Sequence, residues 1–287
     1  MILGTAREST QGLRVEAAAR ELRALTAFVL KGFRVMVSYR LGFLLRCLYV
    51  LSLVSVFYFF GKIFAVDQAA GIAQYGGDYV AFILVGFTFQ DLYRAALSVY
   101  PSTVLSDQRA GTLEYLMSTH LGIHRYLHYS SAWGYANAMI NAAITLIVGT
   151  LIFGTTFSPD ILAALVITLL MVVTIACLGV TAAGIVLVVK QGNPIEFIFS
   201  ITSLVFGGVM FPYTLLPKAL QAISRAHPLT YALHALRLAL LQDHTVEMLM
   251  PQIETLICFA LVLLPISILT LRWGYNRARR EGSLAQY

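Results

Sequence analysis

Asp91 and Arg94 are two ionisable residues that lie three positions apart inside a long apolar segment. At this spacing on a helix, the two side chains are close enough to form an ion pair. Arg46, near the start of an earlier apolar segment, is a second candidate partner for Asp91. Because an unpaired charge inside a bilayer is costly, such residues are candidates for a transport path or a proton relay. A structural pair that holds the first two apolar segments together is an equally good interpretation.

Three histidines also share one helical face, because His120, His124 and His128 fall at i, i+4 and i+8. Such a face could bind a metal or carry a proton. No carboxylate or cysteine accompanies them at ligand spacing, and histidine is also common where a helix meets lipid headgroups. We therefore predict no metal site.

The sequence lacks the common motifs of enzymatic catalysis. It contains no Gly-x4-Gly-Lys-Ser/Thr loop for ATP phosphates, no Gly-x-Ser-x-Gly and no His-Glu-x-x-His. We predict no catalytic residues and no cofactor bound by this chain, which favours a transport subunit that obtains its energy from another protein.

The composition is that of an integral membrane protein, with 59% hydrophobic and 12% charged residues among 287. A helix needs about 20 apolar residues to cross a bilayer. Segments of suitable length indicate an all-α protein with six spans: 41–60, 79–100, 132–153, 161–189, 195–216 and 253–273. Cys47, Cys177 and Cys258 lie inside apolar runs, so we expect buried free thiols.

Basic residues are concentrated near the two ends of the chain. Those of the C-terminal tail are Arg272, Arg277, Arg279 and Arg280. An even number of spans places both termini on one side, which the positive-inside rule predicts to be cytoplasmic. We expect a multi-pass protein of the cytoplasmic membrane, and the net charge of +6 then reflects topology rather than a nucleic-acid partner.

The cytoplasmic segment 1–40 contains an amphipathic pattern, and residues 41–287 form the expected transmembrane domain. The apolar stripe consists of Leu22, Leu25, Val29, Phe33 and Met36. The opposite, basic face consists of Arg20, Arg23, Lys31 and Arg34. This arrangement predicts a helix that lies on the membrane surface and contacts anionic lipids.

The loop between the second and third spans, near residues 106–125, has a short helix pattern. Thr112 can cap its start, and Glu114 is favourable in the first turn. Leu113, Leu116 and Met117 would form an apolar knob on the cytoplasmic surface, which suits insertion into a groove of a partner protein. An ordinary connection between two spans is the alternative.

The fifth apolar segment is interrupted by Gly207, Gly208, Pro212 and Pro217. Non-helical backbone is tolerated at membrane depth only where protein or a wet cavity surrounds it. Two short amphipathic pieces follow, separated by His227-Pro228. We therefore expect the fifth segment to break and short re-entrant helices, near residues 217–246, to fold back into the outer leaflet.

Several side chains of the spans are further candidates for the transport path or for helix packing. The aromatic candidates for the path are Phe57, Phe60, Phe206, Phe211 and Tyr213. Asn137 and Asn141 share a face of the third span and are expected to form hydrogen bonds between helices.

Two stretches resemble the permeases of type-2 ATP-binding-cassette exporters. In the C-terminal half the matching residues are Gly208, Phe211-Pro212, Leu216-Pro217, Pro228-Leu229-Thr230-Tyr231-Ala232 and Arg237. In the loop after the second span they are Asp107, Arg109, Gly111-Thr112-Leu113-Glu114 and Leu116. His120 follows Thr119 where the family often has proline, which is a departure in the turn.

The resemblance implies a homodimer with two nucleotide-binding ATPase subunits, which bind ATP and Mg and dock on the loop near residues 106–125. It also implies that the first, second and fifth spans face the path. We expect an export permease that moves an amphipathic or lipid-linked substrate, with export of a polysaccharide or teichoic-acid-type polymer as the alternative. An ion-coupled secondary transporter, with Asp91 and Arg94 as its relay, is a further alternative.

Overall fold

The computed structural model describes residues 71–112, 122–189 and 192–280, together with scattered positions between residues 26 and 59. Several predicted site residues lie outside this described part: Leu22, Leu25, Val29, Met36, Arg20, Arg23, Lys31, Phe57, Phe60, Leu113, Glu114, Leu116 and Met117. Predictions for these residues stay predictions.

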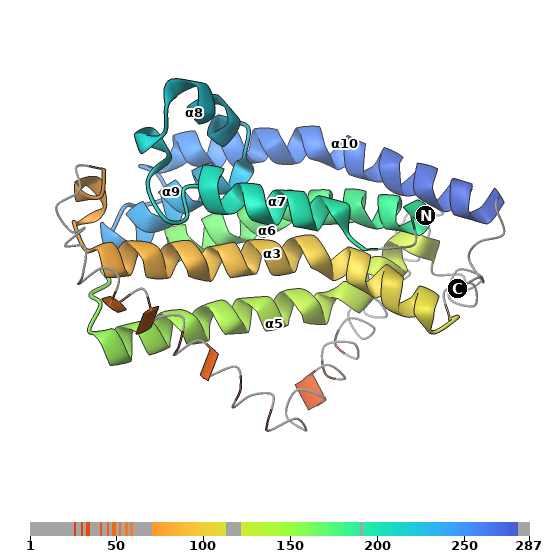
Figure 1. Cartoon of the computed structure of the whole chain (residues 1–287), viewed down its shortest axis with the longest axis horizontal. Coiled ribbons are helices and arrows are strands. Elements are labelled where there is room, and N and C mark those ends of the chain that lie inside the picture. The colour runs from red at the N-terminus through yellow and green to blue at the C-terminus, as the bar shows by residue number, and fades with distance from the viewer. Residues whose placement is uncertain are drawn as a thin grey trace, which may run out of the picture.

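Within the described part, regular structure is entirely helical, and the long helices run along the long axis of the molecule (Figure 1). The elements are η2 (Ala73–Tyr75), α3 (Tyr79–Arg109), α5 (Gly122–Phe153), α6 (Ile161–Val189), α7 (Pro194–Phe206), η3 (Tyr213–Leu215), α8 (Lys218–Arg225), α9 (Pro228–Leu241) and α10 (Met250–Arg280). This all-helical architecture agrees with the fold class predicted from the sequence.

Four helices of the described part are long and apolar enough to cross a membrane: Tyr79–Arg109, Arg125–Phe153, Ile161–Val189 and Met250–Arg280. They correspond to the predicted second, third, fourth and sixth spans, and three of them extend beyond the predicted ends. The predicted first span falls on residues of which only single positions are described. The chain is therefore a multi-pass membrane protein, and the number of six spans stays a prediction.

The fifth segment differs from the prediction in its length. Its helix, α7, begins at Pro194 after an Asn193 cap and ends at Phe206 rather than at residue 216. The break occurs at the predicted glycines, because Gly208 adopts a positive φ of 74° that favours glycine. At about 1.5 Å per residue, the 13 residues of α7 measure about 20 Å.

The two helices after this break do not share the amphipathic character expected of both. Helix α8 is short, as predicted, and it is mostly exposed. Helix α9 is almost completely buried, and it packs against α6, α3 and α10. The expectation of two amphipathic pieces is therefore wrong for α9, because a helix enclosed by three others needs apolar residues on every side. The position of both helices in the outer leaflet stays a prediction.

Helix α6 lies at the centre of the described bundle and packs against α10, α3 and α9. Its contact with α10 is very close, because a Cβ atom added at Gly274 would overlap the carbonyl oxygen of Gly184. Small residues allow such backbone approach between helices in a membrane, where lipid competes with side chains for apolar contacts. Of the described cysteines, Cys177 on α6 is buried as expected, whereas Cys258 on α10 is exposed because it lies on the outer surface of the bundle.

Candidate functional site

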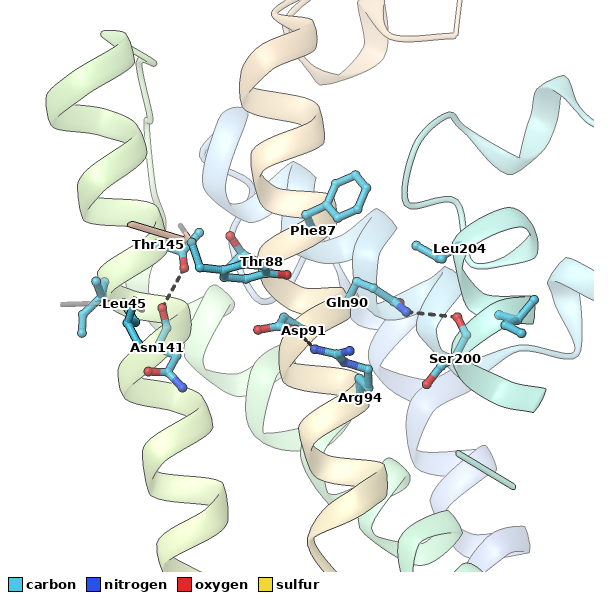
Figure 2. A pocket seen from close by; sticks show the side chains of 13 residues that line it. Leu45, Phe87, Thr88, Gln90, Asp91, Arg94, Asn141, Thr145, Ser200 and Leu204 are labelled. Carbon is cyan, nitrogen blue, oxygen red and sulfur yellow. Dashed lines mark hydrogen bonds and ion pairs between the residues drawn. The ribbon is translucent and has the colours of Figure 1, made fainter. Parts of the chain in front are cut away.

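A groove of about 590 Å³ lies along α3, between α5 and α7. Figure 2 shows its side chains, with α3 in the middle. Leu45 and Tyr49, from the predicted first span, complete its lining. The polar residues of the groove, apart from Tyr49, are Thr88, Gln90, Asp91, Arg94, Asn141, Thr145 and Ser200. This volume lies within the range of about 300–1,000 Å³ that is usual for small-molecule sites.

The predicted pair of ionisable residues is present in this groove. Arg94 Nη2 lies 2.8 Å from Asp91 Oδ1, and the side chains are 55% and 52% exposed. Both residues belong to α3, so their ion pair does not link α3 to another helix. Charged groups that remain half exposed in a chain of this composition are available to a bound molecule. Arg46, the alternative partner for Asp91, lies outside the described part.

Gln90, next to Asp91 in the chain, connects α3 to α7. Its amide nitrogen donates to Ser203 Oγ at 2.6 Å and to the carbonyl oxygen of Ser200 at 3.4 Å. Gln90 and Ser203 are both buried. This contact fixes α7 against the polar face of α3, and neither residue was identified from the sequence.

Three of the aromatic residues predicted for the path are described by the structure, and they lie outside the groove. Phe206 is the last residue of α7, and Phe211 and Tyr213 follow it in the segment that leads to α8. None of the three lines the groove. Instead, the aromatic lining consists of Tyr49 and Phe87.

The structure describes no hydrogen bond between helices for the side chain of Asn141. It was expected to form hydrogen bonds between helices, but its side chain lines the groove, and its carboxamide oxygen has no hydrogen-bond partner in the described part of the chain. Asn137, its neighbour on the same predicted face, does not line the groove.

A second cluster of polar groups surrounds Arg237 of α9, which is 2% exposed. Its guanidinium donates to the carbonyl oxygens of Phe82, Gly208 and Val209 at 3.2, 2.7 and 2.8 Å. The guanidinium carbon also lies 3.4 Å from the centre of the Phe82 ring. The contacts with Gly208 and Val209 satisfy backbone carbonyls that the break after α7 leaves without helical partners, whereas Phe82 lies within α3.

Two histidines of the described part lie close to tyrosine hydroxyls. His128 Nδ1 lies 2.7 Å from the hydroxyl of Tyr100, and His234 Nδ1 lies 2.7 Å from that of Tyr75. The side chains of His120 and His124 are outside the described part. Among the residues that the structure describes, no group of three or more potential metal ligands is found.

At the opposite end of the bundle from α8, the loop after α3 begins with a compact turn. The hydroxyl of Tyr126 on α5 donates to Asp107 Oδ2, which ties the end of α3 to the start of α5. Gly111 has a φ of 65°, and the amide of Thr112 donates to the Asp107 carbonyl oxygen at 3.0 Å. Arg109 is the last residue of α3 and is exposed. The helix that Thr112 was predicted to cap lies outside the described part.

Of the predicted surface helix, Phe33 and Arg34 are described, and both are helical and exposed. The Phe33 ring packs edge-on against Trp133 of α5, with ring centres 6.3 Å apart. A member of the predicted apolar stripe thus contacts the bundle directly.

Comparison with protein families agrees with the resemblance noted from the sequence. The family described as ABC-2 type transporter matches residues 23–241, which include the groove and the Arg237 cluster. A comparison with curated proteins finds no significant match.

Proposed function

This chain belongs to the ABC-2 type transporter family and is a transport permease of the membrane, and from this premise we propose that it forms the export path of an ATP-driven transporter. The proposed substrate is an amphipathic or lipid-linked molecule that leaves the cell across the cytoplasmic membrane. ATP hydrolysis takes place on a separate nucleotide-binding partner, which also binds the Mg that accompanies ATP.

The groove on α3 is the observation that carries this proposal. It combines the half-exposed Asp91–Arg94 pair with an otherwise largely apolar lining. Polar and charged groups are rarely kept inside a membrane bundle without a functional reason, because their transfer from water is costly. Its residues come from the predicted first, second and fifth spans, with a contribution from α5. The family resemblance places the first, second and fifth spans along the path.

In this proposal, two copies of the chain pair so that their grooves face a shared path, and two ATPase subunits dock on the cytoplasmic side. The N-terminal and C-terminal ends are cytoplasmic, as the distribution of arginine and lysine suggests. The predicted surface helix lies against the inner leaflet next to the ATPase contact.

Movement reaches the groove through the ends of α3 and α5. The Tyr126–Asp107 contact joins these helices next to the predicted coupling helix. Closure of the ATPase pair on ATP displaces this helix, and α3 then carries the movement to Asp91 and Arg94. The mechanism is a switch between two packings of the spans, which the ATPase contacts stabilise to different extents.

Affinity purification of the tagged chain from its native membrane in mild detergent tests this function. We expect a soluble ATPase to co-purify, and we expect replacement of Leu113 and Leu116 with aspartate to remove it. Thr150→Val, an exposed position on α5 distant from the loop, is the matched control. A chain that purifies alone and moves its substrate with a proton gradient would contradict the proposal and favour an ion-coupled transporter.

Polymer export by the same architecture is the second candidate. It is consistent with the predicted amphipathic helix at the membrane surface. Single-channel recording on the purified complex distinguishes the two, because a continuous path open to a long polymer conducts ions when it is empty, whereas a path that takes one molecule at a time stays closed.

A further inference from the structure

Helix α10 ends in a group of arginines that the described part of the chain leaves uncovered. These residues are Arg272, Arg277, Arg279 and Arg280, and all four are exposed. The segment 255–281 contains them and a single acidic residue, Glu281, so positive charge prevails. Among the described residues, neither Arg279 nor Arg280 has an ion-pair partner. The end of α10 is therefore a strongly basic surface.

The arginines lie on the same side of α10 as its exposed apolar residues. Leu261 and Val262 are both exposed. Arg279 and Arg280 follow them by 18 residues, which is about five turns of a helix. Residues separated by whole turns point in the same direction. One side of α10 thus carries apolar side chains along its middle and arginines at its end.

The opposite side of α10 fixes this end of the helix to the bundle. Gly274 lies against the backbone of Gly184 on α6, and Ala278 is completely buried in a cluster that includes Leu187. In Figure 1 this end lies far from α8, at the same end of the bundle as the end of α3. Because Gly274 and Ala278 face the bundle, the arginines are held facing away from it.

Trp273 marks the depth at which the apolar part of this surface ends. Its side chain is exposed, and tryptophan is enriched where a membrane helix meets the lipid headgroups. At about 1.5 Å per residue, Arg279 and Arg280 begin about 9–10 Å beyond Trp273 along the helix. The headgroup layer is about 5–8 Å thick on each side of a bilayer, and a long arginine side chain reaches back toward it.

A hollow beside the last turns of α10 gives these groups a common target. Its lining in the part that the structure describes consists of Asn276, Arg279 and Arg280. All three side chains are exposed, so a ligand can reach them. Guanidinium and amide groups donate hydrogen bonds, and the oxygens of a phosphate accept several of them at once.

The helix dipole accounts for only part of this pattern. A cation is favourable at the C-terminus of a helix, but the effect fades beyond the last turn, and Arg272 lies about two turns before the end. An acidic surface of a soluble protein would complement the arginines but gives no reason for the exposed Trp273 and the apolar side that leads to it. A lipid complements both.

We propose that the surface formed by Trp273, Asn276, Arg279 and Arg280 binds the headgroup of an anionic phospholipid. Asn276 and the two arginines donate to the phosphate oxygens, while the acyl chains pack on Trp273 and the apolar side of α10. The arginines repel the cationic group of a zwitterionic lipid, so the site selects net negative charge. This site lies apart from the groove and is independent of the transported substrate.

Fluorescence of Trp273 tests the proposal directly. The chain has two tryptophans, so the full-length Trp133→Phe protein reports on Trp273 alone. Bromine on an acyl chain quenches a tryptophan that it contacts. We expect brominated phosphatidylglycerol in phosphatidylcholine vesicles to bind beside Trp273 about tenfold more tightly than brominated phosphatidylcholine. Each arginine at an anionic surface contributes a factor of about three to five to this preference.

Variants in the same background locate the site. Arg279→Gln and Arg280→Gln should each reduce the preference for phosphatidylglycerol about threefold, and the double variant should abolish it. Arg125→Gln, an exposed position at the start of α5, is the control for one lost charge. Lys218→Gln combined with Arg225→Gln on α8 is the control for two. Neither control should change the preference, and all variants should remain folded because the replaced side chains are exposed.

Equal quenching by the two lipids would overturn the proposal. A loss in Arg125→Gln as large as that in Arg279→Gln would do so too, because the attraction would then be a diffuse effect of surface charge.

Two further measurements exclude other occupants. Soluble glycerol phosphate at millimolar concentration should not displace the brominated lipid, and full displacement would assign the hollow to a free phosphate compound. Co-purification of an ATPase should survive in the double variant. Loss of the ATPase with an unchanged lipid preference would assign the arginines to a protein contact instead. A chain without lipid preference that still retains its ATPase keeps the proposed function and loses this site.

Discussion

Arg237 and Phe82 are in direct contact, with the guanidinium carbon of Arg237 3.4 Å above the centre of the Phe82 ring. The same guanidinium donates to the carbonyl oxygen of Phe82 on α3 and to those of Gly208 and Val209 after α7. One side chain of α9 thus holds together a long helix and the broken end of a short one. No carboxylate pairs with this buried cation in the described part of the chain, so its charge is balanced by carbonyl dipoles and an aromatic face.

Arg237→Met should destabilise the protein strongly. The substitution retains an apolar side chain of similar length but leaves the buried carbonyls of Gly208 and Val209 without their donor, which we expect to cost about 3 kcal/mol or more. Thermal unfolding in detergent, followed by loss of monodisperse protein, measures the effect. The exposed Arg225→Met on α8 is the control, and similar unfolding temperatures for the two variants would contradict a structural role for Arg237.

Gly86→Ala should also destabilise the protein, because Gly86 of α3 lies against the guanidinium of Arg237. A Cβ atom at Gly86 would overlap the Val209 carbonyl oxygen and lie 2.6 Å from Nη2 of Arg237. Overpacking of this kind costs about 1–3 kcal/mol. Ser102→Ala, at an exposed position of the same helix, should leave the unfolding temperature nearly unchanged. If Gly86→Ala and Ser102→Ala unfold at the same temperature, α9 can move away from α3 without loss of stability.

Asp91→Asn and Arg94→Gln should affect transport much more than stability. Because both side chains are about half exposed, the ion pair contributes only about 0–1 kcal/mol to folding. Each variant should therefore unfold near the temperature of the native chain, while its transport rate in reconstituted vesicles falls at least about tenfold, since an unpaired charge remains in the groove. A large loss of stability with normal transport by the surviving protein would assign the pair to folding instead.

Tyr126→Phe should weaken the link between the loop and the bundle. The substitution removes only the hydroxyl that donates to Asp107, a bond to a charged group worth about 1.5–3 kcal/mol. We expect the ATPase to co-purify normally but its hydrolysis to respond less to substrate, which a phosphate-release assay measures. Tyr129→Phe, one helical turn along α5, is the matched control. Equal responses in the two variants would exclude a specific part for the Asp107 contact.

Features that depend on neighbours in the sequence could be predicted without a structure. Hydropathy located the four long helices, the i, i+3 spacing identified the Asp91–Arg94 pair, and the glycines marked the break after α7. These features follow from local geometry and from the length of chain that a bilayer requires.

Contacts between distant parts of the chain could not be obtained in this way. Gln90 and Ser203 are separated by 113 positions, and Arg237 and Phe82 by 155. Periodicity gives the face of a helix on which a residue lies, but it does not give the helix that covers this face. For the same reason, the sequence did not indicate that Thr88 and Ser200 line one groove. Phe206, Phe211 and Tyr213 lie outside this groove, and their part in the path stays a prediction.

The shortness of α7 has a consequence for the surrounding lipid. A helix of about 20 Å is shorter than a hydrocarbon core of about 30 Å, so if α7 begins at one membrane surface, it ends inside the core. The bilayer next to this helix then meets hydrophobic mismatch, which local thinning relieves at a small cost per ångström. A thinned annulus beside the groove would shorten the distance that the proposed lipid-linked substrate travels between leaflets. If the substrate is lipid-linked as proposed, bilayer thickness, varied through acyl-chain length, should then change the rate of transport.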